Sequence, residues 1–397
     1  MFTRETKIGL IATFSTMTAF AFSSNAIPPL VTTIANDFHI EYATFGGYVV
    51  MLQFTFFALA SLCGGWAAHR FGFSNRSLVI TGILFLAILL MAGSTFPNFK
   101  WFIFWAIPLG FAGGLVETFG AIMICRFGGP QSSKMLNFGQ VFFCLGAIIA
   151  PTLIAFILGY GFSWRVSFLG LGILILVIGI WFIYQTRTLK EPTWEMTDIG
   201  HKNSDAFAPT VKIPLLSDPL LYYLCGALFT YVAVEGSIIV WVASYFEKNL
   251  GLPAKDAAWR LSVYWAGMLL GRSLILLLRG RWTLWPALLA ASTGMMLSNI
   301  VLSFKWGPLA ATILVLVGGL LAGPLWPTIV TMSQQMRNSS AFTSCVIGIG
   351  ALGAAFGPLS SSYVIKYLGT KYFFPILAAE GVVLITFILK ARSYKSS

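Results

Sequence analysis

The chain has 397 residues, of which 57% are hydrophobic and 10% are charged, and its net charge is +12. Its mean hydropathy is +0.83. Because soluble globular proteins contain about 25% charged residues, this composition excludes an ordinary soluble domain and predicts a protein that crosses a membrane many times. A helical span needs about 20 apolar residues, so the length divides into about twelve spans.

Twelve apolar segments follow one another along the chain. They cover residues 8–35, 42–68, 78–96, 99–125, 134–160, 164–184, 220–246, 257–278, 284–304, 309–333, 341–363 and 372–390. A hydrophilic segment with mixed charges and three prolines separates the first six from the last six. We therefore predict an all-α polytopic membrane protein with a six-helix bundle at 1–184, a cytoplasmic linker at 185–216 and a second six-helix bundle at 217–397.

The positive charges are distributed unevenly between the two sides that these spans define. Loops on the side of the chain ends carry sixteen Lys and Arg residues, loops on the other side carry eight, and Arg272 lies inside a span. Since loops rich in Lys and Arg stay in the cytoplasm, both termini are predicted to be cytoplasmic. The charge is thus an orientation signal, and no basic patch with interleaved aromatic residues points to a nucleic acid partner.

Two spans carry signals for a broken helix. In the first span, Pro28 and Pro29 follow the polar residue Asn25, and in the tenth span Gly323 to Pro327 reads Gly-Pro-Leu-Trp-Pro. Proline cannot continue the hydrogen bonding of a helix. We predict a kink in span 1, a polar notch that faces a cavity, or both. Broken helices often border the binding sites of transporters, which makes span 10 a candidate as well.

Polar side chains lie at equal depth in spans 4 and 5. Glu117 lies nine residues before Arg126, and Gln140 lies ten residues after Pro130, so both are roughly 14 Å deep in the membrane. Such residues usually line a water-filled cavity or a solute pathway. The alternative is structural, with the neighbouring glycines packing against another helix and Glu117 bonding to a neighbour.

The second half of the chain contains three ionisable residues within spans. Glu235 lies one turn after Tyr231 in span 7, Arg272 lies in span 8, and Glu380 lies in span 12. Arg272 is expected to be structural, by pairing with Glu235 or Glu380 or by extending toward the inner membrane surface. The aromatic residues Trp241 and Trp326 are candidates to stack on a sugar ring.

Several features argue against an enzyme. The three histidines lie in loops, and no cluster of His, Cys and Asp has the spacing of a catalytic or metal site, so no metal and no cofactor are expected. The run Gly348-Ile-Gly350-Ala-Leu-Gly353 matches a dinucleotide-binding pattern in its letters. No strand is expected before it, and it lies within a span, so we interpret it as a close helix contact.

One loop motif carries a family resemblance. Between spans 2 and 3, Gly65, Arg70 and Gly72 fit the Gly-x-x-x-Asp-Arg-x-Gly pattern of the major facilitator superfamily, with His69 in the place of the aspartate. With the two sets of six spans, nearly the whole chain resembles this superfamily. The resemblance implies two six-helix bundles around a central cavity, and a conformational role for the loop and for Arg272.

A closer resemblance is to the fucose–galactose–glucose:proton symporter family. The residues that carry it are Leu115-Val-Glu117-Thr118, Gly129-Pro-Gln-Ser-Ser133, Leu136-Asn137-x-x-Gln140-x-Phe142, Tyr231-Val-Ala-Val-Glu235, Gly271-Arg272 and Trp326-Pro327-Thr328-Ile329. In that family the glutamate of the span 4 motif takes part in sugar binding and proton coupling, which implies both roles for Glu117. The family's span 1 aspartate follows an asparagine, whereas here Ala26 follows Asn25. Glu235 is the candidate replacement in proton coupling, unless another ion or no ion is coupled.

The sequence therefore predicts a secondary transporter of a small polar solute, with a sugar and a proton as the expected partners and sodium as the alternative ion. The expected solute-binding residues are Asn25, Glu117, Asn137, Gln140, Tyr231, Glu235, Trp241 and Trp326. The main alternative within transport is an exporter of a lipidic or drug-like compound. A sensor or scaffold is less favoured, because the linker is too short for an added domain. The expected location is the bacterial inner membrane, and the resemblance implies a monomer surrounded by lipid.

Overall fold

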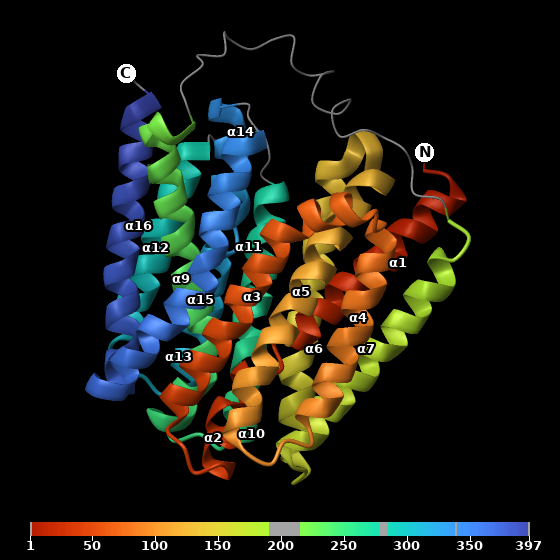
Figure 1. Ribbon diagram of the computed structural model, residues 1–397. Helices are drawn as coiled ribbons and strands as arrows, with labels where there is room; N and C mark the ends of the chain where they lie inside the picture. The colour runs from red at the N-terminus through yellow and green to blue at the C-terminus, as the bar shows by residue number, and fades with distance from the viewer. Residues whose placement is uncertain (1, 190–214, 278–283, 338–339, 396–397) are drawn as a thin grey trace. The chain divides into compact units, whose positions relative to one another are not determined.

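The structure, a computed structural model, describes residues 2–189, 215–277, 284–337 and 340–395. Helices joined by short turns make up these residues, and no strand occurs within them (Figure 1). Eleven helical segments of this described part are long and apolar enough to cross a membrane. The predicted span 8 corresponds to α11 (Arg260–Leu277), which ends where the description breaks off after residue 277. The predicted all-α polytopic fold class is confirmed.

The helices of the first half follow the predicted spans closely. They are α1 (Arg4–Ser24), η1 (Pro28–Leu30), α2 (Val31–Asp37), α3 (Tyr42–Phe71), α4 (Asn75–Gly93), α5 (Phe99–Gly128), η2 (Gly129–Gln131), α6 (Ser132–Gly159) and α7 (Trp164–Thr186). Side-chain caps fix several starts, because the first N–H groups of a helix have no partner within it. Asn98 accepts from the N–H of Lys100 before α5, and Ser163 accepts from the N–H of Arg165 before α7.

The second half repeats this agreement. Its elements are η3 (Leu215–Ser217), α9 (Pro219–Lys248), α10 (Ala254–Ala258), α11, α12 (Leu284–Leu302), α13 (Pro308–Ala322), α14 (Leu325–Arg337), α15 (Ser340–Leu368), η4 (Thr370–Tyr372) and α16 (Phe373–Lys395). Asp218 caps α9 by accepting from the N–H of Leu220, and it also pairs with Arg337 at the end of α14, at 2.5 Å. The end of α14 is thereby tied to the start of α9.

Both predicted helix breaks are confirmed. Span 1 is interrupted between α1 and η1, immediately before Pro28, and span 10 is interrupted between α13 and α14 at Gly323 and Pro324. Because proline lacks an N–H group and fixes its own φ angle, the chain leaves the helical path at these residues. Following the predicted orientation of the termini, we call the end of the spans with the α2–α3 turn the outer end.

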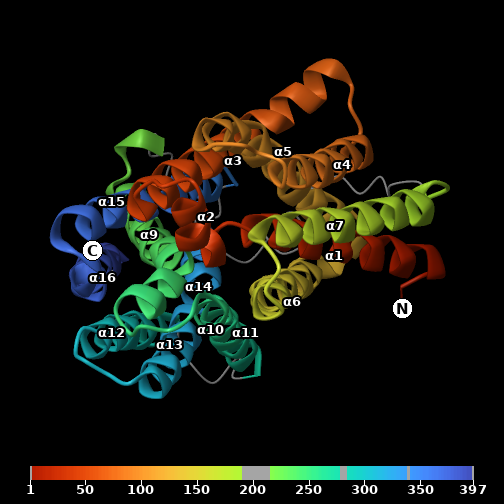
Figure 2. The same cartoon turned by 90° about the horizontal axis from the view of Figure 1, so that it is seen from below.

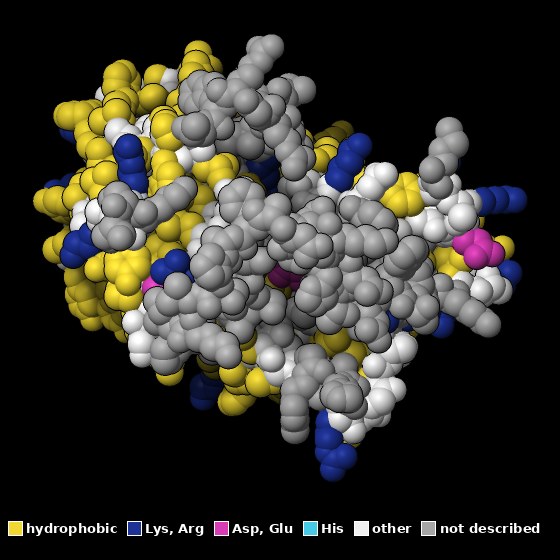
Figure 3. Space-filling model, turned by 90° about the horizontal axis from the view of Figure 1, so that it is seen from above, with side chains coloured by type: hydrophobic (Ala, Val, Ile, Leu, Met, Phe, Trp, Pro, Cys, Tyr) yellow, Lys and Arg dark blue, Asp and Glu magenta, His cyan; other side chains and the backbone are white. Residues whose placement is uncertain are grey.

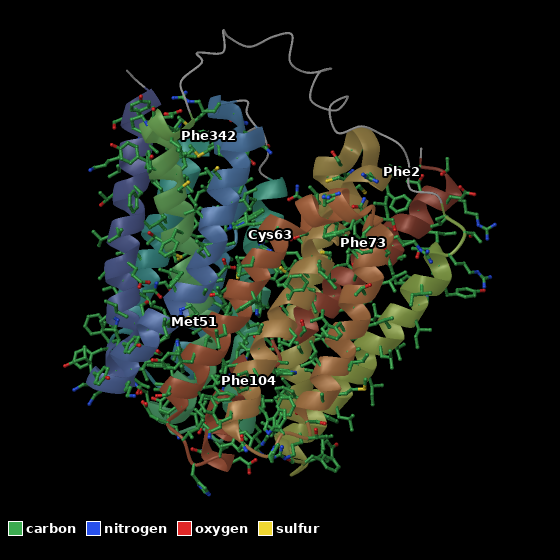
Figure 4. All side chains as sticks on the ribbon, in the orientation of Figure 1. Phe2, Met51, Cys63, Phe73, Phe104 and Phe342 are labelled. Atoms are coloured by element: carbon green, nitrogen blue, oxygen red, sulfur yellow. The ribbon has the colours of Figure 1, made fainter. Side chains whose placement is uncertain are left out.

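Apolar side chains cover the flanks of the helices. Phe104 on α5, labelled in Figure 4, is 69% exposed, and Leu309 on α13 is 75% exposed. Figure 3 shows the same pattern, with hydrophobic side chains (yellow) on the flanks and Lys and Arg (dark blue) projecting between them. A bilayer accepts such a surface, because lipid tails are as apolar as these side chains.

The chain forms two compact units, which interleave along the sequence. Unit 1 contains residues 1–26, 56–150 and 163–211, and unit 2 contains residues 27–55, 151–162 and 212–397. In unit 1, α5 and α7 each pack against both α1 and α4; in unit 2, α15 and α16 pack against α9, and α11 packs against α13. The division into 1–184, 185–216 and 217–397 stays a prediction, and most of the linker lies outside the described residues.

Glycines set the closest helix contact in unit 2. A Cβ atom at Gly267 or Gly271 of α11 would meet the backbone carbonyls of Leu316 or Leu320 on α13, and one at Gly319 would meet the carbonyl of Tyr264 on α11. Gly267 and Gly271 are four residues apart, so they lie on one face of α11. Small residues in this pattern let two backbones touch within a membrane.

The glycine run of α15 makes the same kind of contact with α9. A Cβ atom at Gly350 would meet Leu228, and Cβ atoms at Gly353 and Gly357 would meet the carbonyls of Phe229 and Ala233. The run lies inside a membrane helix, not between a strand and a helix. The interpretation as a close helix contact is confirmed.

The α11–α13 contact yields a stability prediction. In Gly319→Val, side-chain atoms would overlap backbone that cannot move aside, so we expect the variant to be less stable by roughly 1–3 kcal/mol. The measurement is the midpoint of thermal unfolding in detergent. Gly170→Val on α7 is the matched control, because nothing lies within 4 Å of a Cβ atom at Gly170. Equal midpoints for the two variants would contradict the contact.

Candidate functional site

Glu117 lies on the side of α5 that packs against α1. One turn to each side of it, a Cβ atom at Gly113 would lie 3.0 Å from the ring of Phe20, and one at Gly120 would meet Met17. The glycines therefore bring α5 close to α1, which partly buries Glu117. No hydrogen bond or ion pair joins Glu117 to another residue in the part of the chain that the structure describes.

The helix α6 approaches the same stretch of α1 from another side. Phe143 packs on Phe20 with ring centroids 5.6 Å apart, and Thr18 donates a hydrogen bond to the backbone carbonyl of Phe142 at 3.1 Å. A Cβ atom at Gly139, the residue before Gln140, would lie 2.9 Å from Ile124 of α5 and 3.8 Å from Met17. The helices that carry Glu117 and Gln140, α5 and α6, thus both contact one short segment of α1, residues 17–20. Gln140 and Asn137 are both partly buried.

Aromatic side chains surround this part of unit 1. Phe20 stacks on Phe57 of α3 with ring centroids 5.4 Å apart, and Phe14 stacks on Phe142 at 5.2 Å. A single carboxyl group and an amide therefore lie among phenylalanines. This environment suits a ligand that has both hydroxyl groups and an apolar face.

Asn25 ends α1 at the predicted break. Its side-chain Nδ2 donates to the carbonyl of Ala21 at 3.0 Å and to Ser24 Oγ at 3.2 Å, and its backbone N–H bonds to the Ala21 carbonyl. The side chain is buried, with 1% exposed. In this structure Asn25 caps the helix, and this contact was not anticipated from its spacing.

In unit 2 the two charged residues of spans 7 and 8 meet. Arg272 Nη2 lies 4.0 Å from Glu235 Oε1, and Arg272 Nε donates to the carbonyl of Gly323 at 3.4 Å. This carbonyl belongs to the break between α13 and α14, where the end of α13 favours a positive charge. The structure selects Glu235 as the partner of Arg272. On α16, Glu380 Oε2 is buried without a hydrogen-bond partner among the described residues.

Two buried tyrosines accompany this ion pair. The hydroxyls of Tyr231 on α9 and Tyr264 on α11 have no hydrogen-bond partner within the described ranges, and the same holds for Nδ2 of Asn299. Tyr264 and Asn299 line a small cavity together with Ile238 of α9. Sequence reasoning missed Tyr264, although it lies two turns before Arg272 on the same face of α11.

Of the two tryptophans proposed for sugar stacking, Trp241 is engaged within the protein. Its indole N–H donates to the carbonyl of Pro358 at 3.0 Å, and its ring meets Tyr42 edge-on with centroids 6.3 Å apart. Trp326 lies partly buried at the start of α14, directly after the break.

The loop motif between spans 2 and 3 lies at the end of α3. Gly72 has a φ angle of 69° and nothing within 4 Å of a Cβ atom, so a glycine is favoured there by backbone conformation. Arg70 is exposed. The side chain of His69 lies outside the described residues.

The predicted site residues fall into two sets. Asn25, Glu117, Asn137 and Gln140 belong to unit 1, and Tyr231, Glu235, Trp241, Arg272 and Trp326 belong to unit 2. In each unit these polar side chains lie among apolar side chains. Among the described residues, no group of three His, Cys, Asp or Glu side chains could hold a metal ion. The chemistry that these sets offer is hydrogen bonding and proton exchange.

Known sequences resemble this chain over most of its length. The family model described as Major Facilitator Superfamily matches residues 11–351. The chain is 23% identical over 331 residues to the Protein TsgA homolog of Serratia proteamaculans, which covers 80% of this chain and 76% of that protein. It is also 23% identical over 326 residues to Protein TsgA of Salmonella typhimurium, a match that covers 81% of this chain and 76% of that protein.

Solved structures share the fold at low sequence identity. The D-xylose-proton symporter superposes with a TM-score of 0.74 and 16% identity, covering 96% of each chain. A bacterial homolog to the human lysosomal transporter Spinster, in its inward-facing and unoccupied conformation, superposes with a TM-score of 0.72 and 14% sequence identity. The superposition covers 99% of this chain and 97% of that chain. The transporter FucP in the outward conformation superposes with a TM-score of 0.65 and 17% sequence identity. The superposition covers 98% of this chain and 99% of FucP.

The Glu235–Arg272 pair yields a second stability prediction. Removing one partner leaves a buried charge unmatched, which costs roughly 3–5 kcal/mol. We therefore expect Glu235→Gln and Arg272→Met each to lower the unfolding midpoint in detergent, and the double variant to recover most of the loss.

The matched control is the exposed pair Glu41–Lys366, whose side chains are 39% and 40% exposed. Removing either partner there should change stability by less than about 1 kcal/mol. If the double variant at Glu235 and Arg272 lowered the unfolding midpoint by as much as the two single variants together, the two side chains would not interact.

Proposed function

This chain belongs to the major facilitator superfamily and is a multi-pass membrane transporter, and we propose that it carries a neutral sugar together with a proton by alternating access. The observation that carries the proposal is Glu117, a partly buried carboxyl group without a hydrogen bond or ion pair to any other described residue. The proposed location is the bacterial inner membrane.

The contrast with Glu235 explains why Glu117 is the preferred coupling residue. Glu235 lies 4.0 Å from the guanidinium of Arg272, so its negative charge is matched within unit 2. Glu117 has no such cation among the described residues. A carboxylate inside a membrane is costly unless something compensates it, and a proton or a hydroxyl group of the solute would do so in turn. Glu235 is the second candidate for proton coupling.

The proposed solute class rests on the polar groups beside Glu117 and on the structural neighbours. A carboxyl group and the amides of Gln140 and Asn137 offer both acceptors and donors, as the hydroxyl groups of a sugar require. Two neighbours of the same fold are a D-xylose-proton symporter and FucP. Their likeness supports the class of solute.

A second candidate function is export of an amphipathic compound. The observation that favours it is the aromatic surround of Glu117, in which Phe20 stacks on Phe57 and Phe14 stacks on Phe142. Such a surround binds apolar surface well. The two functions differ in the direction of net movement and in the solute. One set of proteoliposome assays, with sugars outside or a hydrophobic dye inside, can therefore separate them.

The third prediction concerns coupling. In proteoliposomes with an inward proton gradient, we expect accumulation of one sugar among D-xylose, L-fucose, D-galactose and D-glucose. Glu117→Gln keeps the shape of the side chain but cannot release a proton. We expect it to lose accumulation by about tenfold or more, while exchange of labelled for unlabelled sugar without a gradient stays within about threefold.

Glu380→Gln is the matched control, because Glu380 is also a buried carboxyl group in a membrane helix, on α16. It should retain gradient-driven accumulation. Replacing the proton gradient by a sodium gradient tests the other ion, and liposomes loaded with a hydrophobic cationic dye test export. Full accumulation by Glu117→Gln would overturn the coupling role, and dye export without sugar uptake would select the second candidate.

The fourth prediction concerns solute binding. In Gln140→Leu the amide is lost at nearly constant volume, so one hydrogen bond to the sugar is lost. At roughly 1 kcal/mol for such a bond, we expect KM for uptake to rise about 3- to 10-fold with a smaller change in maximal rate. Gln334→Leu, at an exposed amide of α14, is the control. An unchanged KM would remove Gln140 from the solute site.

A further inference from the structure

The second half of α3 makes a close contact with α5 inside unit 1. Figures 1 and 2 both show the two helices beside each other. A Cβ atom at Gly114 of α5 would lie 2.6 Å from the backbone oxygen of Phe57 on α3. Further along both helices, a Cβ atom at Gly64 of α3 would lie 3.1 Å from the ring of Phe119 on α5. The two helices therefore run side by side in the same direction.

Ser61 lies in the middle of this contact. It comes one helical turn after Phe57, whose ring stacks on Phe20 of α1 and lies 3.7 Å from a Cβ atom built at Gly113. Glu117 likewise comes one turn after Gly113, and residues four apart share one face of a helix. Ser61 and Glu117 therefore lie at the same level of two adjacent helices, on the side that faces α1.

The hydroxyl of Ser61 differs from most others in the membrane helices. Such a hydroxyl often donates to the carbonyl one turn back, as Ser237 donates to Ala233 at 2.7 Å and Ser273 donates to Leu269 at 2.8 Å. Ser61 Oγ is buried and has no hydrogen-bond partner among the described residues. Because an unpaired buried hydroxyl costs free energy, this position favours a ligand that pairs with it.

We infer that Ser61 is a further solute-binding residue, which holds one hydroxyl group of the sugar together with Glu117. The inference rests on the proposed transport of a sugar. When Glu117 is ionised, the sugar hydroxyl can donate to the carboxylate and accept from Ser61. When Glu117 carries the proton, the carboxyl group donates to the sugar oxygen, and the sugar hydroxyl donates to Ser61. Ser61 thus keeps its bond to the sugar in both states.

This arrangement makes Ser61 a residue that selects among sugars. A site whose buried polar groups bind one hydroxyl group rejects an analogue that lacks it, because those groups are then left unpaired. Glu117 alone leaves one buried group unpaired with such an analogue, whereas Glu117 and Ser61 leave two. Ser61 therefore increases the selectivity for a single position of the sugar ring and leaves the other positions unaffected.

The test compares uptake of the transported sugar with uptake of its monodeoxy analogues, each of which lacks one hydroxyl group. For the wild type, we expect kcat/KM for one analogue to be about 30-fold or more below that for the parent sugar. In Ser61→Ala this ratio should fall about fivefold or more, while the ratios for the other analogues stay within about twofold. A merely structural role would lower uptake of all these sugars alike.

Ser167→Ala is the matched control, because Ser167 Oγ on α7 is also buried without a hydrogen-bond partner in the described part of the chain. It should leave every ratio unchanged. If Ser61→Ala keeps the ratios of the wild type for all analogues, the inference is wrong.

A second readout needs no sugar, so it separates failure of this inference from failure of the proposed function. The native cysteines are first replaced by Ala: Cys63, Cys125, Cys144, Cys225 and Cys345. The thiol introduced by Ser61→Cys then reacts through its thiolate with the small reagent methyl methanethiosulfonate. A neighbouring carboxylate opposes formation of the thiolate, because both carry a negative charge.

At alkaline pH, adding Glu117→Gln should therefore speed the reaction about threefold or more. Adding Glu380→Gln on α16 is the control, and it should leave the rate within about 1.5-fold. Equal rates with Glu117→Gln and Glu380→Gln would overturn the inference, as would a thiol at position 61 that does not react.

Discussion

Backbone-to-backbone contact at glycines is the constraint on which unit 2 depends. Lipid tails are as apolar as leucine side chains, so burial in a neighbouring helix gains little from the hydrophobic effect. Close approach gains dispersion energy instead, and it is possible only where no Cβ atom intervenes. Gly319 meets α11, Gly353 meets α9, and both contacts are with main-chain oxygens. These contacts fix the positions of α11 and α15, and through α11 that of Arg272.

Two of the three membrane carboxyl groups, Glu235 and Glu117, show how environment divides their roles. Glu235 is matched by Arg272, which also bonds to the carbonyl at the break of span 10. Its charge is thus part of the structure that holds α9, α11 and α13 together. Glu117 lies where α5 approaches α1, among phenylalanines and without a matching cation among the described residues. A group in that environment can exchange partners without dismantling a helix contact.

Much of the fold could be predicted because hydropathy and proline act locally. The apolar segments match the helices to within a few residues, and Pro28 and Pro324 lie at the two breaks. The partner of Arg272 stayed open between Glu235 and Glu380, because pairing depends on the rotation of three helices about their axes. The sequence likewise presented Trp241 as an aromatic residue near a solute, since nothing in its sequence neighbours reveals its contacts with Pro358 and Tyr42. Which residues of distant spans face each other could therefore not be decided from the sequence.

Proline also occurs where the chain passes between the two units. Span 1 leaves unit 1 after Ala26, just before Pro28, and α6 leaves it at Pro151. At Pro151 the helix is one hydrogen bond short, since the carbonyl of Ala147 receives no N–H from that residue. A helix bends most easily where a backbone hydrogen bond is missing. We therefore expect these two spans to bend most easily at the residues where they pass from one unit to the other.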